Sequence, residues 1–289
     1  MQVAVISGKG GTGKSSLTAA FATLSQKVVL VDCDVDAANL YILFNPSHDE
    51  ELEYVGSQKA IIDYTQCTHC GLCLTYCRFD AISITDGRVE ISETFCDGCF
   101  LCSRICPAEA ISMVKNDKSR MYTGSFRNGI MVYGRLAAGE ENSGKMVNEL
   151  RDRAKQVARE NSIETILLDG PPGIGCPVIS TVTGVDSVVI VTEPTLSALH
   201  DLERTLGITE KFALKVWVVI NKNDINPDLR DRINIFCKSR NVAIAGELPF
   251  DPIVVESMVS CKSMTEWAPE SQTSKEIRNI WKRIHSQSL

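Results

Sequence analysis

Short hydrophobic runs, uninterrupted by polar residues, mark strands of a sheet that is buried on both faces. Two such runs lie near the N-terminus, at residues 1–7 and 27–32, and a helical pattern covers residues 14–23 between them. A strand, a turn, a helix and a second strand within about 30 residues form a βαβ unit, so this region predicts a parallel sheet.

The same pattern stops near Asn45 and resumes near Asn128. The later segments are a strand at 128–136, a helix at 145–160, strands at 165–169, 187–194 and 216–224, and a final strand near 247–251. We therefore expect one α/β domain, a mostly parallel sheet flanked by helices, made of residues 1–58 and 118–289. Residues 59–117 interrupt it.

The interrupting segment contains a repeat of 29 residues and eight of the chain's 12 cysteines. They form two runs with the spacing C-x₂-C-x₂-C-x₃-C, namely Cys67, Cys70, Cys73 and Cys77, then Cys96, Cys99, Cys102 and Cys106. Cysteines this dense in one part of a longer chain indicate metal ligation rather than a disulfide scaffold. Two half-modules related by pseudo-symmetry are the simplest explanation of the repeat.

Charge and hydropathy narrow the classes of function. The net charge of −6 argues against nucleic acid as the main partner, because phosphate binding needs a basic surface. The sequence has no run of about 18 apolar residues, which a membrane-spanning helix needs. Its first residues also lack the basic and apolar regions of a secretory signal. We expect a reducing, low-oxygen cytoplasm as the location.

A glycine-rich loop follows the first predicted strand and precedes the first predicted helix. It reads GKGGTGKS and fits the phosphate-binding pattern G-x-x-x-x-G-K-[ST] in the context that this motif requires. Its backbone N–H groups can converge on phosphate oxygens, so the alternative of a turn that binds nothing is disfavoured. The expected nucleotide-binding residues here are Gly8, Lys9, Gly10, Gly11, Thr12, Gly13, Lys14, Ser15 and Ser16. Lys14 would contact the β- and γ-phosphates, and the Ser15 hydroxyl would ligate Mg²⁺.

Lys9, at the second position of the loop, together with Thr12, makes the loop resemble the deviant Walker A family of MinD, ParA, Mrp and the nitrogenase iron protein. The resemblance covers all of the chain outside 59–117. It implies an ATPase whose nucleotide-dependent dimer, with a second copy or with a similar ATPase, encloses two nucleotides. Lys9 would then reach the nucleotide of the other subunit and act in catalysis beside Lys14. The alternative is a solvated surface lysine.

The resemblance also implies roles for residues that follow the predicted strands. Asp34 would orient the attacking water, and Asp32 and Asp169 would support Mg²⁺. The segment Gly170–Gly173 resembles the second switch, and Thr192–Thr195 resembles a segment of the iron protein. The expected base-contacting residues are Asn221, Pro249, Phe250 and Asp251.

The cysteine runs resemble a bacterial two-[4Fe–4S] ferredoxin, a small α+β domain, in which the fourth cysteine of each run ligates the other cluster. This resemblance implies one cluster held by Cys67, Cys70, Cys73 and Cys106 and a second held by Cys96, Cys99, Cys102 and Cys77. Two four-cysteine zinc sites are the alternative, although three closely spaced cysteines fit zinc ribbons poorly. Such clusters could transfer electrons or only stabilise a small module.

The remaining cysteines and the C-terminal segment have simpler interpretations. We expect Cys33, Cys176, Cys237 and Cys261 to pack as small apolar residues. Cys176 matches a cluster cysteine of the iron protein, but the second cysteine that would complete a subunit-bridging cluster is missing. The segment with Ile277, Ile280, Trp281 and Ile284 predicts a basic amphipathic helix. We expect it to cover the sheet, and membrane binding is the alternative.

Three functions fit these features. The favoured one is an ATPase whose nucleotide-dependent dimer gates electron transfer through two [4Fe–4S] clusters to a partner redox protein. The second, implied by the resemblance to Mrp, is assembly or delivery of iron–sulfur clusters. The third is a MinD-like positioning ATPase that uses the clusters as a redox sensor.

Overall fold

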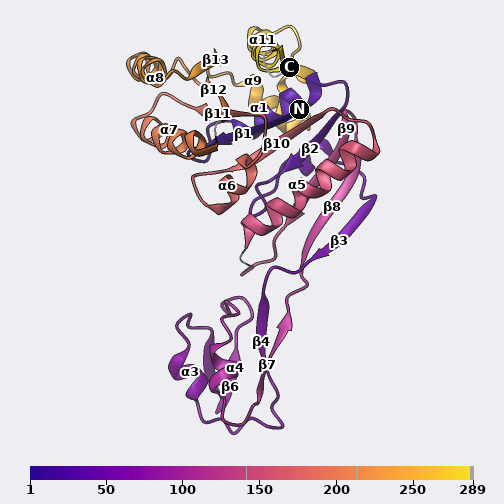
Figure 1. Ribbon diagram of the computed structural model, residues 1–289, viewed down its shortest axis with the longest axis vertical. Helices are drawn as coiled ribbons and strands as arrows, with labels where there is room; N and C mark the ends of the chain where they lie inside the picture. The colour runs from indigo at the N-terminus through magenta and orange to yellow at the C-terminus, as the bar shows by residue number, and fades with distance from the viewer. Residues whose placement is uncertain (141, 213, 287–289) are drawn as a thin grey trace.

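The computed structural model describes residues 1–140, 142–212 and 214–286, which form two lobes (Figure 1). The larger lobe is a nine-stranded sheet with helices on both faces. The smaller lobe projects from one end of the larger lobe. The chain enters it after strand β3 (Glu50–Tyr54) and leaves it before strand β8 (Ser119–Phe126), and these two strands pair with each other.

The central sheet is mostly parallel, as the sequence predicts. Its strand order is β13-β12-β11-β1-β10-β2-β9-β8-β3. The seven parallel strands are β13 (Ala243–Glu247), β12 (Lys215–Ile220), β11 (Ser187–Thr192), β1 (Gln2–Ser7), β10 (Thr165–Pro172), β2 (Val28–Asp32) and β9 (Gly129–Arg135). Strand β8 is antiparallel to both β9 and β3, which completes the edge of the sheet next to the smaller lobe.

Alternate residues of each buried strand enter two separate hydrophobic cores, as the two-residue period of a strand requires. One core contains α1 (Lys14–Leu24), α2 (Leu40–Phe44), α10 (Met264–Trp267) and α11 (Gln272–Ser286). The other contains α5 (Ser143–Glu160), α6 (Cys176–Val182), α7 (Leu196–Thr209) and α8 (Pro227–Ser239). The 3₁₀ helix η1 (Glu210–Phe212) follows α7, and α9 (Ile253–Val259) lies beside α10.

The smaller lobe preserves the 29-residue repeat in its backbone. Its elements are β4 (Gln58–Ile62), α3 (Leu72–Tyr76) and β5 (Ile82–Thr85), then β6 (Arg88–Ile91), α4 (Leu101–Ile105) and β7 (Ile111–Lys115). Strand β4 pairs with β7 and β5 pairs with β6, so each two-stranded sheet takes one strand from each repeat. Positive φ angles recur at three equivalent pairs, namely His69 and Gly98, Gly71 and Phe100, and Asp80 and Glu109.

Two expectations about the strands need correction. The last strand is Ala243–Glu247, whereas residues 248–251 form a loop, because Pro249 has no N–H for a sheet ladder. Strands β3 and β8 were not expected at all. Strand β3 carries three glutamates in five residues, as suits an edge strand, and therefore gives no hydrophobic run.

The C-terminal helix α11 covers the sheet instead of presenting an apolar face to solvent. Ile277, Ile280, Trp281 and Ile284 are all buried, and the Trp281 ring stacks on Phe21 of α1 with 4.7 Å between centroids. The basic side chains of this helix lie outside that buried stripe, and Arg283 donates to the Ala245 carbonyl. No helix in the described part of the chain is long and apolar enough to cross a membrane.

Truncation of the buried face of α11 is expected to destabilise the larger lobe. Ile280→Ala should lower the free energy of unfolding by about 2–4 kcal/mol, because the fully buried side chain leaves a cavity over Gly246. Lys282→Ala, on the exposed side of the same helix, should change it by less than about 0.5 kcal/mol. Urea denaturation measures both, and equal effects would show that this face is not packed.

Candidate functional site

The glycine-rich loop connects β1 to α1 at the carboxyl end of the sheet. Gly11 and Gly13 have positive φ angles of 80° and 89°, a conformation that costs glycine little. A Cβ atom at Gly13 would overlap the amide of Asn221, which donates to the Thr12 carbonyl at 2.8 Å. Gly13 therefore allows the loop to approach the end of β12 closely.

The start of α1 converges on Asp169, a fully buried residue of β10. The Lys14 ammonium lies 2.9 Å from one Asp169 carboxylate oxygen, and the Ser15 hydroxyl donates to that oxygen at 2.7 Å. Thr18 donates to the other carboxylate oxygen at 2.7 Å. A serine hydroxyl beside a carboxylate is a donor set that suits Mg²⁺, so Ser15 and Asp169 are able to hold this ion at the phosphates.

Asp32 and Asp34 follow the adjacent strand, β2. Asp32 is fully buried and accepts hydrogen bonds from the backbone N–H groups of Asp34, Asn39 and Leu40 at 3.1–3.2 Å. Burial, reinforced by the neighbouring Asp169 carboxylate, raises the pKa of Asp32 to about 7. Asp32 thus fixes the turn after β2 and lies opposite Asp169 on the neighbouring strand. Burial also raises the pKa of the half-buried Asp34 carboxyl above its ordinary value.

Lys9 is held within its own chain. Its ammonium lies 2.7 Å from the Glu193 carboxylate and 3.3 Å from the hydroxyls of Thr195 and Ser197. Lys222 reaches the other oxygen of Glu193 and the Gly11 carbonyl, each at 2.9 Å. Although burial opposes it, hydrogen bonds from the two lysines keep the pKa of Glu193 below its ordinary value. Lys9 is therefore not a freely solvated lysine.

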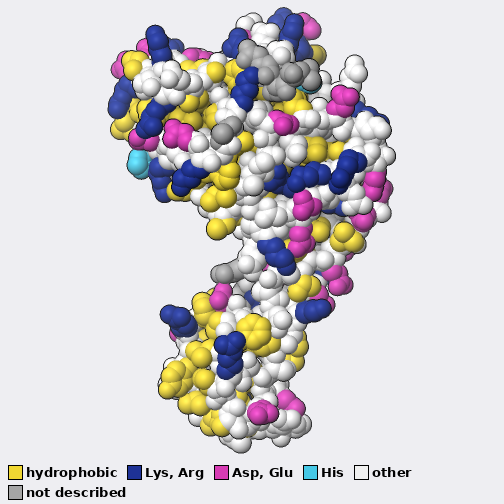
Figure 2. All heavy atoms as spheres, viewed as in Figure 1, with side chains coloured by type: hydrophobic (Ala, Val, Ile, Leu, Met, Phe, Trp, Pro, Cys, Tyr) yellow, Lys and Arg dark blue, Asp and Glu magenta, His cyan; other side chains and the backbone are white. Residues whose placement is uncertain are grey.

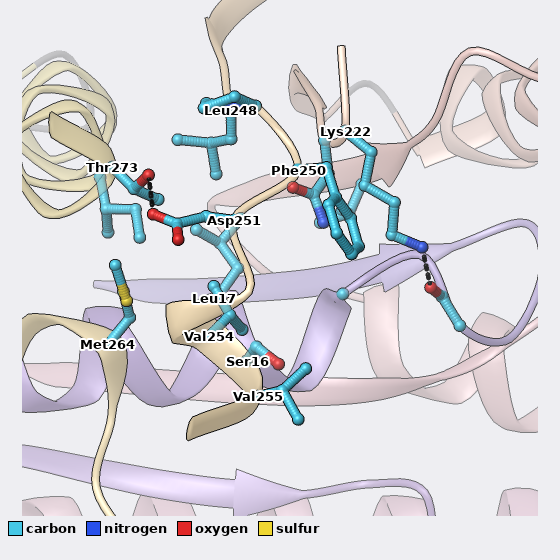
Figure 3. A pocket seen from close by; sticks show the side chains of 16 residues that line it. Ser16, Leu17, Lys222, Leu248, Phe250, Asp251, Val254, Val255, Met264 and Thr273 are labelled. Atoms are coloured by element: carbon cyan, nitrogen blue, oxygen red, sulfur yellow. Dashed lines mark hydrogen bonds between the residues drawn. The ribbon is translucent and has the colours of Figure 1, made fainter. Parts of the chain in front are cut away.

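A cavity opens beside the glycine-rich loop and brings the expected base-contacting residues together (Figure 3). Asn221, Pro249, Phe250 and Asp251 line it with Gly13 and Ser16 of the loop. Leu17, Leu248, Val254 and Met264 give it apolar walls, and Asp251 accepts a hydrogen bond from Thr273 at 2.6 Å. An apolar slot next to a phosphate-binding loop is suited to a purine ring.

The eight clustered cysteines line two further cavities in the smaller lobe. The first, which we name the Cys67 cavity, is lined by Cys67, Cys70, Cys73 and Cys106. The second, the Cys96 cavity, is lined by Cys73, Cys77, Cys96, Cys99 and Cys102, so Cys73 lines both cavities. All eight thiols are free of disulfides, and in the described residues no group of three or more ligand side chains is arranged to hold a single metal ion.

The four isolated cysteines divide differently from the expectation. Cys33 and Cys237 are buried, but Cys176 and Cys261 are exposed, so packing as small apolar residues is wrong for these two. Cys176 begins α6, directly after the glycine-rich segment 170–175, where the backbone cannot enclose it. Cys261 follows α9 in a turn with a φ of 51°.

Three contributors to the nucleotide site were missed from the sequence: Thr18, Glu193 and Lys222. Thr18 lies one helical turn after Lys14, and this spacing is the signal that would place both on the Asp169 side of α1. Glu193 and Lys222 stand in segments that the sequence did single out, but their ion pair joins residues 29 positions apart. Only the parallel pairing of β11 with β12 places them together.

Residues 3–263 match the family model of the CobQ/CobB/MinD/ParA nucleotide-binding domain. The chain belongs to this family. An uncharacterized protein of Methanocaldococcus jannaschii is 36% identical over 291 residues, which cover 98% of this chain and 96% of that protein. MinD, the septum site-determining protein of Thermotoga maritima, is 26% identical over 76% of this chain and 63% of that protein.

Solved structures share the fold. The cell division ATPase MinD of Pyrococcus furiosus has a TM-score of 0.59 and 19% identity, covering 99% of this chain and 98% of that one. MinD of Pyrococcus horikoshii, solved with Mg-ADP, has a TM-score of 0.59 and 18% identity over 99% and 96% of the two chains. With the family and the complete phosphate loop, the chain is a P-loop ATPase of the MinD/ParA type.

Loss of the Asp169 charge should impair hydrolysis in this MinD/ParA-type ATPase. Asp169→Asn should lower kcat for ATP hydrolysis by about 10²–10³-fold, because Mg²⁺ and Lys14 lose the carboxylate that positions them. Asp186→Asn, at the opposite end of the sheet, should leave the rate unchanged. Steady-state phosphate release measures both. An unaltered rate in Asp169→Asn would remove Asp169 from the site.

Proposed function

We propose that this ATPase forms a nucleotide-dependent dimer that gates electron transfer through two [4Fe–4S] clusters to a partner redox protein in the cytoplasm. The observation that carries the proposal is the division of the eight cysteines between two cavities. Each cavity is lined by three cysteines of one run and by the fourth cysteine of the other, as the resemblance to ferredoxins implies, and Cys73 also lines the Cys96 cavity.

The packing of the smaller lobe supports a metal-dependent fold. Its buried apolar side chains are few and mostly small, namely Ala60, Ala81, Ile82, Val89, Cys96, Ala110 and Ile111. Partly buried cysteines pack against this core together with Ile62, Ile91 and Met113. A core this small gives a module of about 60 residues little stability of its own, and a metal centre or another cross-link commonly supplies the rest. Two clusters bound by the eight thiols would supply this stabilisation, and they would also carry single electrons.

The surroundings of the two cavities favour a partner protein over cluster delivery. Leu72 lines the Cys67 cavity, while Tyr76, Phe79 and Phe100 line the Cys96 cavity, and all four side chains are exposed at the surface. Figure 2 shows hydrophobic side chains gathered over this lobe. An exposed apolar surface next to the two cysteine cavities suits transient docking of a partner. Full ligation by protein thiols does not suit a cluster that must leave.

The larger lobe would supply the gate. Lys14, the loop amides and Mg²⁺ stabilise charge on the transferring phosphoryl group. In a dimer with the nucleotides at its interface, Lys9 would exchange Glu193 for the phosphates bound by the other subunit. Solved relatives include a MinC:MinD complex from Aquifex aeolicus, which shows a related ATPase bound to a partner protein.

The cluster assignment predicts the metal content of protein purified without oxygen. The chain should contain about eight iron and about eight acid-labile sulfide atoms and no stoichiometric zinc. Cys70→Ser and Cys99→Ser should each perturb one set of signals in the electron paramagnetic resonance (EPR) spectrum, while Cys261→Ser, outside the lobe, should perturb neither. Four-cysteine zinc sites without sulfide would refute the clusters and leave the ATPase assignment intact.

The proposed dimer predicts that a variant unable to hydrolyse ATP accumulates as the ATP-bound dimer. Asp34→Ala should slow hydrolysis and accumulate a dimer with ATP, because the attacking water loses its orienting carboxylate. Adding Lys9→Ala to this variant should return the protein to a monomer, and Lys9→Ala alone should lower kcat about 10³-fold or more. Light scattering after gel filtration, with ATP and with ADP, measures the association. A Lys9→Ala variant that hydrolyses ATP normally would contradict the contact across the dimer.

A further inference from the structure

We propose that only the cluster in the Cys96 cavity responds to the nucleotide, and that Lys59 and helix α5 transmit this response. The inference rests on the proposed function, since it concerns which of the two clusters the ATPase controls. We call the cluster of the Cys96 cavity the proximal cluster and that of the Cys67 cavity the distal cluster. The contacts between the two lobes carry the argument.

Lys59 connects the proximal cysteine loop to the larger lobe. Its side chain is 3% exposed, and its ammonium donates to the Cys96 carbonyl at 2.6 Å and to the Gly139 carbonyl at 2.7 Å. Gly139 belongs to the loop between β9 and α5, and its φ angle is 72°. A Cβ atom at Gly139 would overlap the carbonyl of Thr94, so the two loops press directly against each other.

The same loop makes a second buried contact with the smaller lobe. Asn116, 4% exposed and just after β7, donates to the carboxylate of Glu140, which is 8% exposed. At the start of α5, Asn142 donates to the Gly56 carbonyl, and its own carbonyl accepts from the Tyr54 hydroxyl. The N-terminal end of α5 therefore holds both chain segments that cross between the lobes.

The body of α5 packs against α6, which begins shortly after the second switch, residues 170–173. Gly144 packs against Cys176 at the start of α6, and Arg151 donates to the Ser180 carbonyl at 2.5 Å. The switch itself is linked to the end of β1, directly before the glycine-rich loop, because the Gly173 N–H donates to the Ser7 carbonyl at 2.8 Å. A contiguous set of contacts thus runs from the phosphate site through α6 and α5 to Cys96.

The distal cysteine loop lacks a matching connection. Within the described residues, the hydrogen bonds of residues 63–77 all stay inside the smaller lobe. The repeat places Arg88 at the position equivalent to Lys59, but Arg88 is exposed and its guanidinium stacks on Tyr64 at 4.6 Å. The pseudo-symmetry of the smaller lobe is therefore broken at Lys59, which is buried on the side that faces the larger lobe.

This asymmetry has two consequences. A movement of the switch and α6 would shift the loop at Gly139 and, through Lys59, the backbone of the proximal cluster ligand Cys96. The buried ammonium also stabilises added negative charge nearby, so Lys59 would raise the reduction potential of the proximal cluster relative to the distal one. Lys59 is a positioning residue in this proposal, because it acts through Cys96.

The test uses the full chain with its clusters, purified without oxygen, in Mg-ADP and in Mg-ATP. Hydrogen exchange of residues 92–99 should slow about fivefold or more in ATP relative to ADP, while residues 67–73 should not change. In an EPR-monitored redox titration, the proximal potential alone should depend on the nucleotide. Cys70→Ser assigns the distal signals.

Lys59→Met should abolish both nucleotide responses and lower the proximal potential in either nucleotide, with the distal potential unchanged. Arg88→Met, the matched control in the other repeat, should retain both responses. Equal responses of the two loops, or none in the wild-type chain, would overturn the inference even if Lys59→Met fails to fold. Protein without iron and sulfide would instead overturn the proposed function, whereas iron-loaded protein without a response overturns the coupling alone.

Discussion

The arrangement of the larger lobe depends on the burial of the Asp169 carboxylate in β10. A buried negative charge is costly unless it is paired and hydrogen-bonded, and a second carboxylate, Asp32, lies on the neighbouring strand. Lys14, Ser15 and Thr18 satisfy Asp169, so the start of α1 is fixed against the sheet. The groups that neutralise Asp169 are the groups that a magnesium nucleotide requires. Nucleotide binding must therefore exchange these internal contacts for contacts with phosphate and metal.

Helix α5 contacts both the smaller lobe and helix α6 of the larger lobe. Its N-terminal end meets the crossing segments at Gly56 and Asn116, and its middle meets α6 beside the switch. Because a helix is stiff along its axis, displacement at one contact is carried to the other with little loss. Flexible tethers between the lobes would leave the smaller lobe to tumble independently, and the buried contacts of Lys59 and Glu140 oppose such freedom.

Local patterns predicted much of this protein from its sequence. The parallel sheet and the phosphate loop with Lys14 and Ser15 follow from hydrophobic runs and a motif with fixed geometry, while Asp169 in β10 was implied by the family resemblance. Strand β3 was missed because it is a polar edge strand, and β8 because polar residues interrupt its apolar ones. The exposure of Cys176 depends on a loop that only the fold defines. The roles of Glu193, Lys59 and Asn116 were not predicted, because each depends on a contact with a partner distant in sequence.

The pairing of Tyr54 with Ser119 has a consequence for how such a chain can arise. Because β3 and β8 are adjacent and antiparallel, they form one β-hairpin, and the whole segment between them is its connecting loop. The entropy of closing a loop grows only with the logarithm of its length, so a whole domain costs the hairpin little more than a long loop would. An edge hairpin is therefore a place where such an ATPase can gain or lose an inserted module without altering its own core.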